Sequence, residues 1–211
     1  MSRAVGNSDI PRPKLKPHSS ADWGLIAAAA NFPGNTYEVN TSIPVNVSGD
    51  NGDYPIDIYY AKTIVDLLEP AGLTYKVYEE NYPTPGECYL ADGYGNESAQ
   101  QVANYNPSAY GISPVNRLYR RKHNPFISFK TFSTNQTRCT NQRDFIDLYD
   151  DIAAGTLPDF SFVVPNEAND NHDTTINYTA IWYDQFFSAL NNSPVYNNSR
   201  VLVHVVYDEG K

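Results

Sequence analysis

Residues 157–174 decide the fold, and they read Leu157-Pro-Asp-Phe-Ser-Phe-Val-Val-Pro-Asn-Glu-Ala-Asn-Asp-Asn-His-Asp-Thr174. Residues 160–164 form a short β-prone run, and Pro165 ends it because proline cannot donate a backbone hydrogen bond to a neighbouring strand. A crowded polar loop follows, and a helical pattern begins after that loop. This order of strand, loop and helix predicts one step of an α/β fold.

The polar loop lies where chemistry is expected, because ligands in open α/β sheets bind beyond the carboxyl ends of the strands. Carboxylates, amides and an imidazole can together ligate a hard metal, hydrogen-bond a phosphate or move a proton. The loop residues with these groups are Asn166, Asn169, Asp170, His172 and Asp173. The local pattern fits equally well a solvated loop in which Asp173 or Thr174 caps the next helix.

Helix and strand patterns alternate on both sides of this stretch. Apolar spacing predicts a helix over residues 56–68, a strand over 74–78, a core-packing helix over 144–154 and a helix over 175–190. The last helix places Ile181, Trp182, Phe186 and Leu190 on or near one face, which indicates a core position. The chain is therefore expected to form a doubly wound sheet.

Two strand ends carry further acidic groups. Residues 201–206 are almost continuously apolar, which is typical of a strand buried on both faces, and we interpret His204 within it as structural. Asp208 and Glu209 follow this run, and two adjacent acids either bind a cation or lie on plain surface. Glu79, Glu80 and Asn81 follow the strand over 74–78, where they either face the site or form a solvated turn.

Composition limits the classes of partner. The chain has 211 residues, enough for one domain with a sizeable core, and a formal net charge of −9. This charge argues against nucleic-acid binding, which needs a basic face. No apolar run approaches the roughly 18 residues of a membrane span. The one dense basic cluster contains Arg117, Arg120, Arg121, Lys122 and His123, and it suits either phosphate oxygens or a solvated helix face.

Other features indicate secretion. Cys88 and Cys139 are the only cysteines and neither lies in a CxxC pair, so a disulfide is the economical interpretation. Sequons for N-glycosylation occur at Asn40, Asn46, Asn96, Asn135, Asn177, Asn191 and Asn197. Residues 1–17 lack the hydrophobic core of a signal peptide. The sequence leaves the oligomeric state open.

Six blocks, taken together and in order, resemble the phosphoesterase family of fungal acid phosphatases and phosphatidylglycerol-specific phospholipases C, within the alkaline-phosphatase-like superfamily. The blocks are Thr63-Ile-Val-Asp-Leu-Leu-Glu69, Tyr78-Glu-Glu-Asn-Tyr-Pro83, Arg121-Lys-His-Asn-Pro125, Phe160-Ser-Phe-Val-Val-Pro-Asn166, Asn169-Asp-Asn-His-Asp-Thr174 and Tyr207-Asp-Glu209. The resemblance implies a doubly wound α/β/α sandwich over residues 18–211, incomplete at both ends, behind a non-family segment over residues 1–17.

The resemblance also implies metal-assisted hydrolysis of a phosphate ester by a serine or threonine nucleophile. Ser19 or Ser20 matches the nucleophile, depending on the register of the block, although Ser19 also fits a helix N-cap. Asp208 and Glu209 are expected to ligate a divalent metal of unknown identity. His172 is expected to contact the phosphate or protonate the leaving group.

Lys122, His123, Asn169 and Asp170 are expected to contact the substrate, a phosphate monoester or a phospholipid headgroup. Family members also take metal ligands from a Glu-Asn pair on an early strand, and residues 1–17 contain no glutamate. The sequence therefore keeps a second hypothesis, in which the chain is a truncated or degenerate relative that at most binds anionic ligands.

Overall fold

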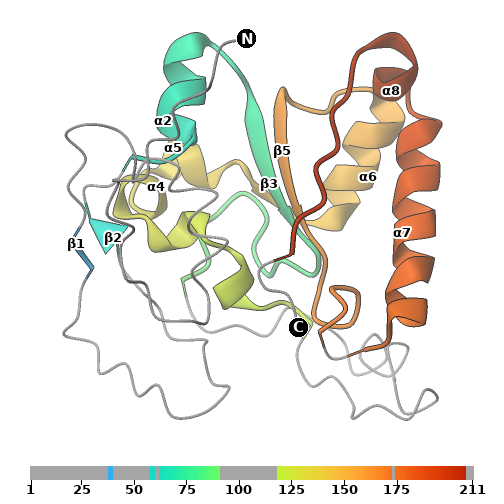
Figure 1. Cartoon of the computed structure of the whole chain (residues 1–211). Helices are drawn as coiled ribbons and strands as arrows, with labels where there is room; N and C mark the ends of the chain where they lie inside the picture. The colour runs from blue at the N-terminus through green and yellow to red at the C-terminus, as the bar shows by residue number, and fades with distance from the viewer. Residues whose placement is uncertain (1–37, 40–57, 60–61, 91–117, 173, 208–211) are drawn as a thin grey trace, which may run out of the picture.

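The computed structural model describes residues 38–39, 58–59, 62–90, 118–172 and 174–207, which Figure 1 shows in colour. In chain order the elements are β1 (Glu38–Val39), β2 (Ile58–Tyr59), α2 (Val65–Leu68), the 3-10 helix η2 (Glu69–Ala71), β3 (Tyr75–Glu79), the 3-10 helices η4 (Arg121–His123) and η5 (Phe126–Ser128), α4 (Lys130–Ser133), α5 (Gln136–Cys139), β4 (Gln142–Arg143), α6 (Phe145–Ala154), β5 (Phe160–Val164), α7 (Ile176–Asn191) and α8 (Pro194–Asn198).

The main sheet is parallel and has β3 at its centre, in the order β4-β3-β5. Tyr75 pairs with Phe160 at one end of the β3–β5 ladder, and Glu79 pairs with Val164 at the other. These two strands therefore end level with one another. The segments that follow Glu79 and Val164 begin side by side at the same edge of the sheet, which is where the candidate site lies.

The two faces of the sheet bury different side chains, because successive residues of a strand point to opposite faces. Tyr75 and Val77 pack with Val65 of α2 and with phenylalanines of η5 and α4. Tyr78 packs on the other face against α6 and α7. Figure 1 shows α6 and α7 on one side of the sheet and α2, α4 and α5 on the other. The expected α/β class, with a parallel sheet between helical layers, is confirmed.

Four predicted elements agree closely with the structure. The strand predicted over residues 74–78 is β3. The strand over residues 160–164 is β5, and the helix over 144–154 is α6, which the Asp144 carboxylate caps by accepting a hydrogen bond from the Asp147 N–H at 3.0 Å. The next predicted helix is α7, and Thr175 caps it instead of Asp173 or Thr174. The α7 side chains Trp182, Phe186 and Leu190 are buried as predicted, but Ile181 is 54 % exposed and belongs to the outer face.

The helix predicted over residues 56–68 is wrong in its first half. Ile58 lies in β2, which pairs antiparallel with β1, and α2 begins only at Val65. The Asp66 carboxylate accepts hydrogen bonds from the backbone N–H and hydroxyl of Thr63 at 2.7 and 3.2 Å, and this local motif opens the helical segment here. Gly72 ends the segment with a positive φ, as expected of a glycine at this position.

The buried strand predicted over residues 201–206 is also wrong. This segment has no regular secondary structure and belongs to neither sheet, and Leu202 is 90 % exposed. Among the residues that the structure describes, β5 pairs with β3 alone, so the apolar run has no ladder partner. His204 therefore lies exposed on an unpaired segment. An apolar run predicts burial, but only a neighbouring strand can supply the partners that its backbone groups need.

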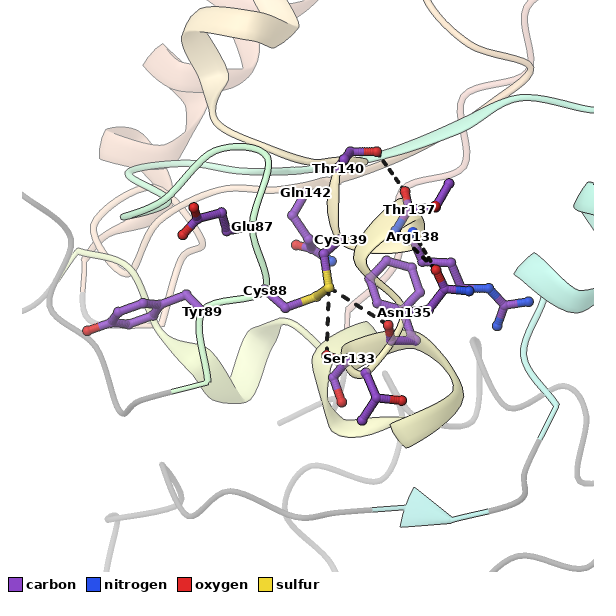
Figure 2. The surroundings of a disulfide bond; sticks show 12 residues. Glu87, Cys88, Tyr89, Ser133, Asn135, Thr137, Arg138, Cys139, Thr140 and Gln142 are labelled. Atoms are coloured by element: carbon purple, nitrogen blue, oxygen red, sulfur yellow. Dashed lines mark hydrogen bonds between the residues drawn. A yellow bond between two sulfur atoms is a disulfide. The ribbon is translucent and has the colours of Figure 1, made fainter.

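A disulfide joins Cys88 and Cys139, as the sequence predicts, and ties the segment after β3 to the end of α5 (Figure 2). Next to it Arg138 donates to Asp66 at 2.7 Å and to Glu69 at 2.6 Å, which connects α5 with α2 and η2.

Within the described part of the chain, no helix has the length and apolar character needed to cross a membrane.

Candidate functional site

The candidate site begins where β3 and β5 end. The backbone N–H of Glu80 donates to the carbonyl of Val164 at 3.0 Å, which continues the strand pairing by one residue. Asn81 then adopts a positive φ of 62°, a conformation that asparagine tolerates better than most residues. The chain turns sharply here, and both side chains face the loop that follows β5.

Glu80 and Asn81 hold that loop by their side chains. One carboxylate oxygen of Glu80 accepts a hydrogen bond from the backbone N–H of Asn166 at 2.9 Å. Both oxygens accept from the side-chain amide of Asn169, at 3.0 and 2.9 Å. The amide oxygen of Asn81 accepts from the side chain of Asn166 at 2.8 Å. The segment after β3 therefore faces the site and is not a solvated turn.

The loop itself is a tight turn built by Asn166. The buried Asn166 side chain accepts hydrogen bonds from the backbone N–H groups of Ala168 and Asn169 at 3.0 and 3.1 Å, which is an Asx turn. Its carbonyl accepts from the Asp170 N–H at 2.9 Å. Asparagine suits this position because its short side chain replaces the backbone acceptors that a regular turn would supply.

Glu167 projects from this turn into a nearly closed environment. Its side chain is only 1 % exposed, and the Arg120 guanidinium contacts both of its oxygens, with Nε 3.0 Å from Oε2 and Nη2 3.1 Å from Oε1. Its backbone N–H donates to the Leu118 carbonyl at 2.9 Å. A two-point contact with a guanidinium is the usual way to stabilise a buried carboxylate. This pair joins the segment after β5 to the segment that leads into η4.

Two histidines lie around the same carboxylate. His123 Nδ1 is 4.0 Å from Glu167 Oε2 and 3.8 Å from Asp170 Oδ2. His172 Nδ1 is 3.9 Å from Glu167 Oε1, and the His172 side chain is 55 % exposed. The backbone N–H of His172 donates to Asp170 Oδ1 at 2.9 Å. Imidazole and carboxylate groups in this arrangement can transfer protons and can ligate a metal.

One donor set within the site could hold a divalent metal ion. His123, Glu167 and Asp170 each offer one ligand atom, and these atoms lie within 4.8 Å of one another. One imidazole nitrogen with two carboxylate oxygens is a common ligand combination for transition metals. This set differs from the predicted ligands Asp208 and Glu209, which lie outside the described residues.

The structure brings together four of the residues expected at the site: His123, Asn169, Asp170 and His172. Lys122 belongs to η4, but its side chain lies outside the description. The nucleophile candidates Ser19 and Ser20 also lie outside it, as do Arg117 and Asp173.

Arg120 and Arg121 do not form a solvated helix face. Arg120 contacts Glu167, and the buried Arg121 donates from Nε to the Leu90 carbonyl at 3.1 Å. These contacts assign Arg120 to the site and give Arg121 a structural partner.

The sequence interpretation missed Glu167 as a site residue, and it missed that Arg120 contacts Glu167. They are 47 positions apart, and spacing along the chain cannot indicate that such a pair meets. One signal was present, because an acid within the amide-rich loop and a basic cluster elsewhere are complementary in charge. Pairing them requires knowing that the segment before η4 passes the carboxyl end of β5.

Comparisons with known proteins identify related chains. The model of the phosphoesterase family matches residues 25–211. The chain is 31% identical to an acid phosphatase of Aspergillus fumigatus over 147 residues, covering 70% of this chain and 29% of that protein. It is 30% identical to a phosphate-repressible acid phosphatase of Penicillium chrysogenum over 161 residues, covering 76% of this chain and 34% of that protein.

A bacterial relative matches more of the chain. A phosphatidylinositol-3-phosphatase of Mycobacterium tuberculosis is 34% identical over 182 residues, which is 86% of this chain and 48% of that protein. The chain thus spans about a third of the length of the fungal relatives and about half of the bacterial one.

Proposed function

The chain belongs to the phosphoesterase family, and we propose that it hydrolyses phosphate esters at the carboxyl edge of its parallel sheet. The observation that carries this proposal is that η4 and the loop after β5, which are distant in sequence, lie side by side around Glu167. His123 precedes the sheet strands β4 and β5, Asp170 and His172 follow β5, and their titratable atoms surround the buried Glu167. Titratable groups of this kind at a strand edge support hydrolytic chemistry.

His172 is our candidate for proton transfer. Its side chain is more than half exposed, so it can reach a bound substrate, and its Nδ1 faces Glu167 at 3.9 Å. We assign proton donation to the leaving group to Nε2 on the opposite side of the ring. The hydrogen bond from the His172 N–H to Asp170 holds the backbone that carries the imidazole.

We assign different roles to Asn169 and Asp170, both of which the sequence predicts as substrate contacts. The Asn169 amide donates to Glu80, which supports a role in holding the loop. Asp170 is anionic and lies 3.8 Å from His123, so a phosphate needs a positive group between itself and this carboxylate. Lys122 and His123 remain the proposed contacts to the phosphate.

The family resemblance also supports a nucleophile at Ser19 or Ser20 and a divalent metal held by Asp208 and Glu209. A bound metal would lower the pKa of the nucleophile and stabilise charge that develops on the phosphate. We assign proton donation to His172 and contact with the phosphate to Lys122 and His123. Phosphate monoesters and phospholipid headgroups share the chemistry that such a site recognises.

Secretion is part of the proposal. The Cys88–Cys139 disulfide supports an oxidising compartment. The sequon asparagines Asn135, Asn177, Asn191 and Asn197 are exposed, so a glycosyltransferase can reach them in the folded chain. The other predicted sequons, Asn40, Asn46 and Asn96, lie outside the described residues. Enzymatic removal of N-glycans from protein expressed in a eukaryotic host should increase its mobility on a gel.

The test compares hydrolysis of a chromogenic phosphate monoester and of a phosphodiester by the purified protein, with divalent metal added, at acidic and neutral pH. His172→Ala should lower kcat by roughly 100-fold or more, the usual contribution of a general acid. His204→Ala is the matched control. It should turn over both substrates as the wild type does, because His204 is exposed on an unpaired segment.

Equal turnover by the wild type and His172→Ala would contradict the assigned role. Phosphate binding without turnover of either substrate would favour the alternative function, a relative that binds anions without catalysis.

A further inference from the structure

We propose that His123, Glu167 and Asp170 form a binding site for a divalent transition-metal ion, with a ligand set that does not include Asp208 or Glu209. The inference rests on the positions of these side chains and does not require that the chain hydrolyse an ester. Its consequence for substrate binding, given below, does rest on the proposed function.

The donor atoms are almost close enough to share an ion. His123 Nδ1 lies 4.0 Å from Glu167 Oε2 and 3.8 Å from Asp170 Oδ2, which is too long for a hydrogen bond. Metal–ligand distances of about 2.0–2.2 Å place neighbouring ligands roughly 3.0–3.6 Å apart in tetrahedral or octahedral geometry. The three donor atoms lie within 4.8 Å of one another, so contraction by about 1–2 Å would complete three ligand contacts.

The elements that carry these ligands are held in place. Glu167 and Asp170 belong to the turn that Asn166 closes and Glu80 anchors. His123 ends η4, and its backbone N–H donates to the Arg120 carbonyl at 3.0 Å. The ligand side chains are mostly withdrawn from solvent, with exposures of 18 % for His123, 1 % for Glu167 and 15 % for Asp170. Ligands on fixed elements lose little entropy when an ion binds.

The charges also suit a cation. Two carboxylates and one guanidinium converge at this point, so the cluster keeps a negative balance before any ion is added. The contact between Arg120 and Glu167 does not exclude ligation, because an ionised carboxylate has about four acceptor positions. Arg120 instead acts as an outer partner that orients the ligand, as such partners do in many metal sites.

The ligand types select the class of metal. An imidazole with two carboxylates favours zinc, manganese or cobalt, whereas calcium and magnesium prefer shells made of oxygen alone. An ion here would place positive charge beside Asp170 and next to His172, where a phosphate otherwise meets two carboxylates. In the proposed hydrolysis the ion would therefore bind a phosphate oxygen within reach of the proton donor.

The experiment measures metal binding directly, without substrate. Metal-stripped protein is titrated with Zn²⁺ in a calorimeter, and Co²⁺ binding is followed by visible absorption, which reports imidazole and carboxylate ligation. His123→Ala and Asp170→Asn should each weaken binding by about tenfold or more, because each removes a ligand. Asp170→Asn keeps the side-chain size, and circular dichroism confirms that each variant is folded.

Two controls make the result specific. His204→Ala should bind as the wild type does, because this exposed histidine lies outside the cluster. The double variant Asp208→Asn/Glu209→Gln should retain the binding event that depends on His123.

Unchanged affinity in folded Asp170→Asn would overturn the site. So would binding that the double variant loses and His123→Ala keeps, or the absence of stoichiometric binding to the folded wild type. Intact metal binding without ester turnover would instead contradict only the proposed function.

Discussion

Glu80 holds the side-chain amide of Asn169 with both carboxylate oxygens, at 3.0 and 2.9 Å, although 89 positions separate the two residues. The contact exists because β3 and β5 are parallel neighbours that end at the same level. The end of one strand thereby sets the shape of the loop that follows the other. Glu167, Asp170 and His172 take their positions from that loop.

Replacing Glu80 should therefore loosen the site and the fold together. Glu80→Gln keeps the side-chain size but replaces one acceptor oxygen with an NH₂ group. In the wild type the donors are the backbone N–H of Asn166 and the side-chain amide of Asn169, and both face a carboxylate. Because hydrogen bonds to charged groups contribute about 1.5–3 kcal/mol, we expect the free energy of unfolding to fall by roughly that amount. Urea denaturation measures it. Glu87→Gln, at an exposed position nearby, is the control, and an equal loss in both variants would contradict the role of Glu80.

Two glycines with the same backbone conformation should respond differently to substitution by alanine. Gly72 and Gly155 have φ of 71° and 72°, so alanine at either should cost about 1–2 kcal/mol of conformational strain. At Gly155 the added Cβ would also lie 2.9 Å from the Pro194 Cβ, whereas at Gly72 nothing lies within 4 Å.

Gly155→Ala should consequently be the more destabilising change, by a further 1 kcal/mol or so of overpacking. Thermal and urea denaturation of the two variants give the difference. Equal losses would mean that α8 moves away from the end of α6 without resistance.

Reduction of the disulfide should destabilise the protein strongly. The bridge between Cys88 and Cys139 closes a loop of 51 residues. In the chain-entropy account such a loop contributes about 4 kcal/mol, because the bridge restricts the unfolded chain. Urea denaturation with and without reductant measures the difference, and intact mass shows whether the thiols are bonded. Free thiols in protein secreted by a eukaryotic host would contradict the bridge.

Asp151 should contribute stability that disappears in acid. Burial raises the pKa of this carboxyl, but hydrogen bonds from Lys76 and Tyr78 outweigh it, so the pKa lies below its ordinary value. A group whose pKa is lower in the folded state stabilises the fold above its unfolded pKa, which is about 3.9 for aspartate. That contribution is lost as pH falls through the folded-state pKa.

The Asp151→Asn variant should therefore be less stable than the wild type at pH 7, with a difference that shrinks below about pH 4. Asp150→Asn is the control, because Asp150 is the exposed neighbour on α6. Denaturation curves between pH 3 and 7 test this, and a difference that stays constant across that range would contradict the assignment.

The elements that the sequence predicted well are those with local signals. The β-prone run before Pro165 became β5, and the apolar spacing after Asp144 became α6. Local signals were misleading where pairing decides the structure. Ile58 fits a helical pattern but lies in β2, and residues 201–206 look like a buried strand but remain unpaired and exposed.

The sequence by itself determined β3, β5, α6 and α7, the disulfide between two lone cysteines and the polar loop that carries Asp170 and His172. The tertiary structure decided that Arg120 contacts Glu167 and that Glu80 anchors Asn169. The physical reason is that apolar spacing and capping act over a few residues, whereas these ion pairs and hydrogen bonds form only after parallel strands align. The chemistry of the site depends on that alignment.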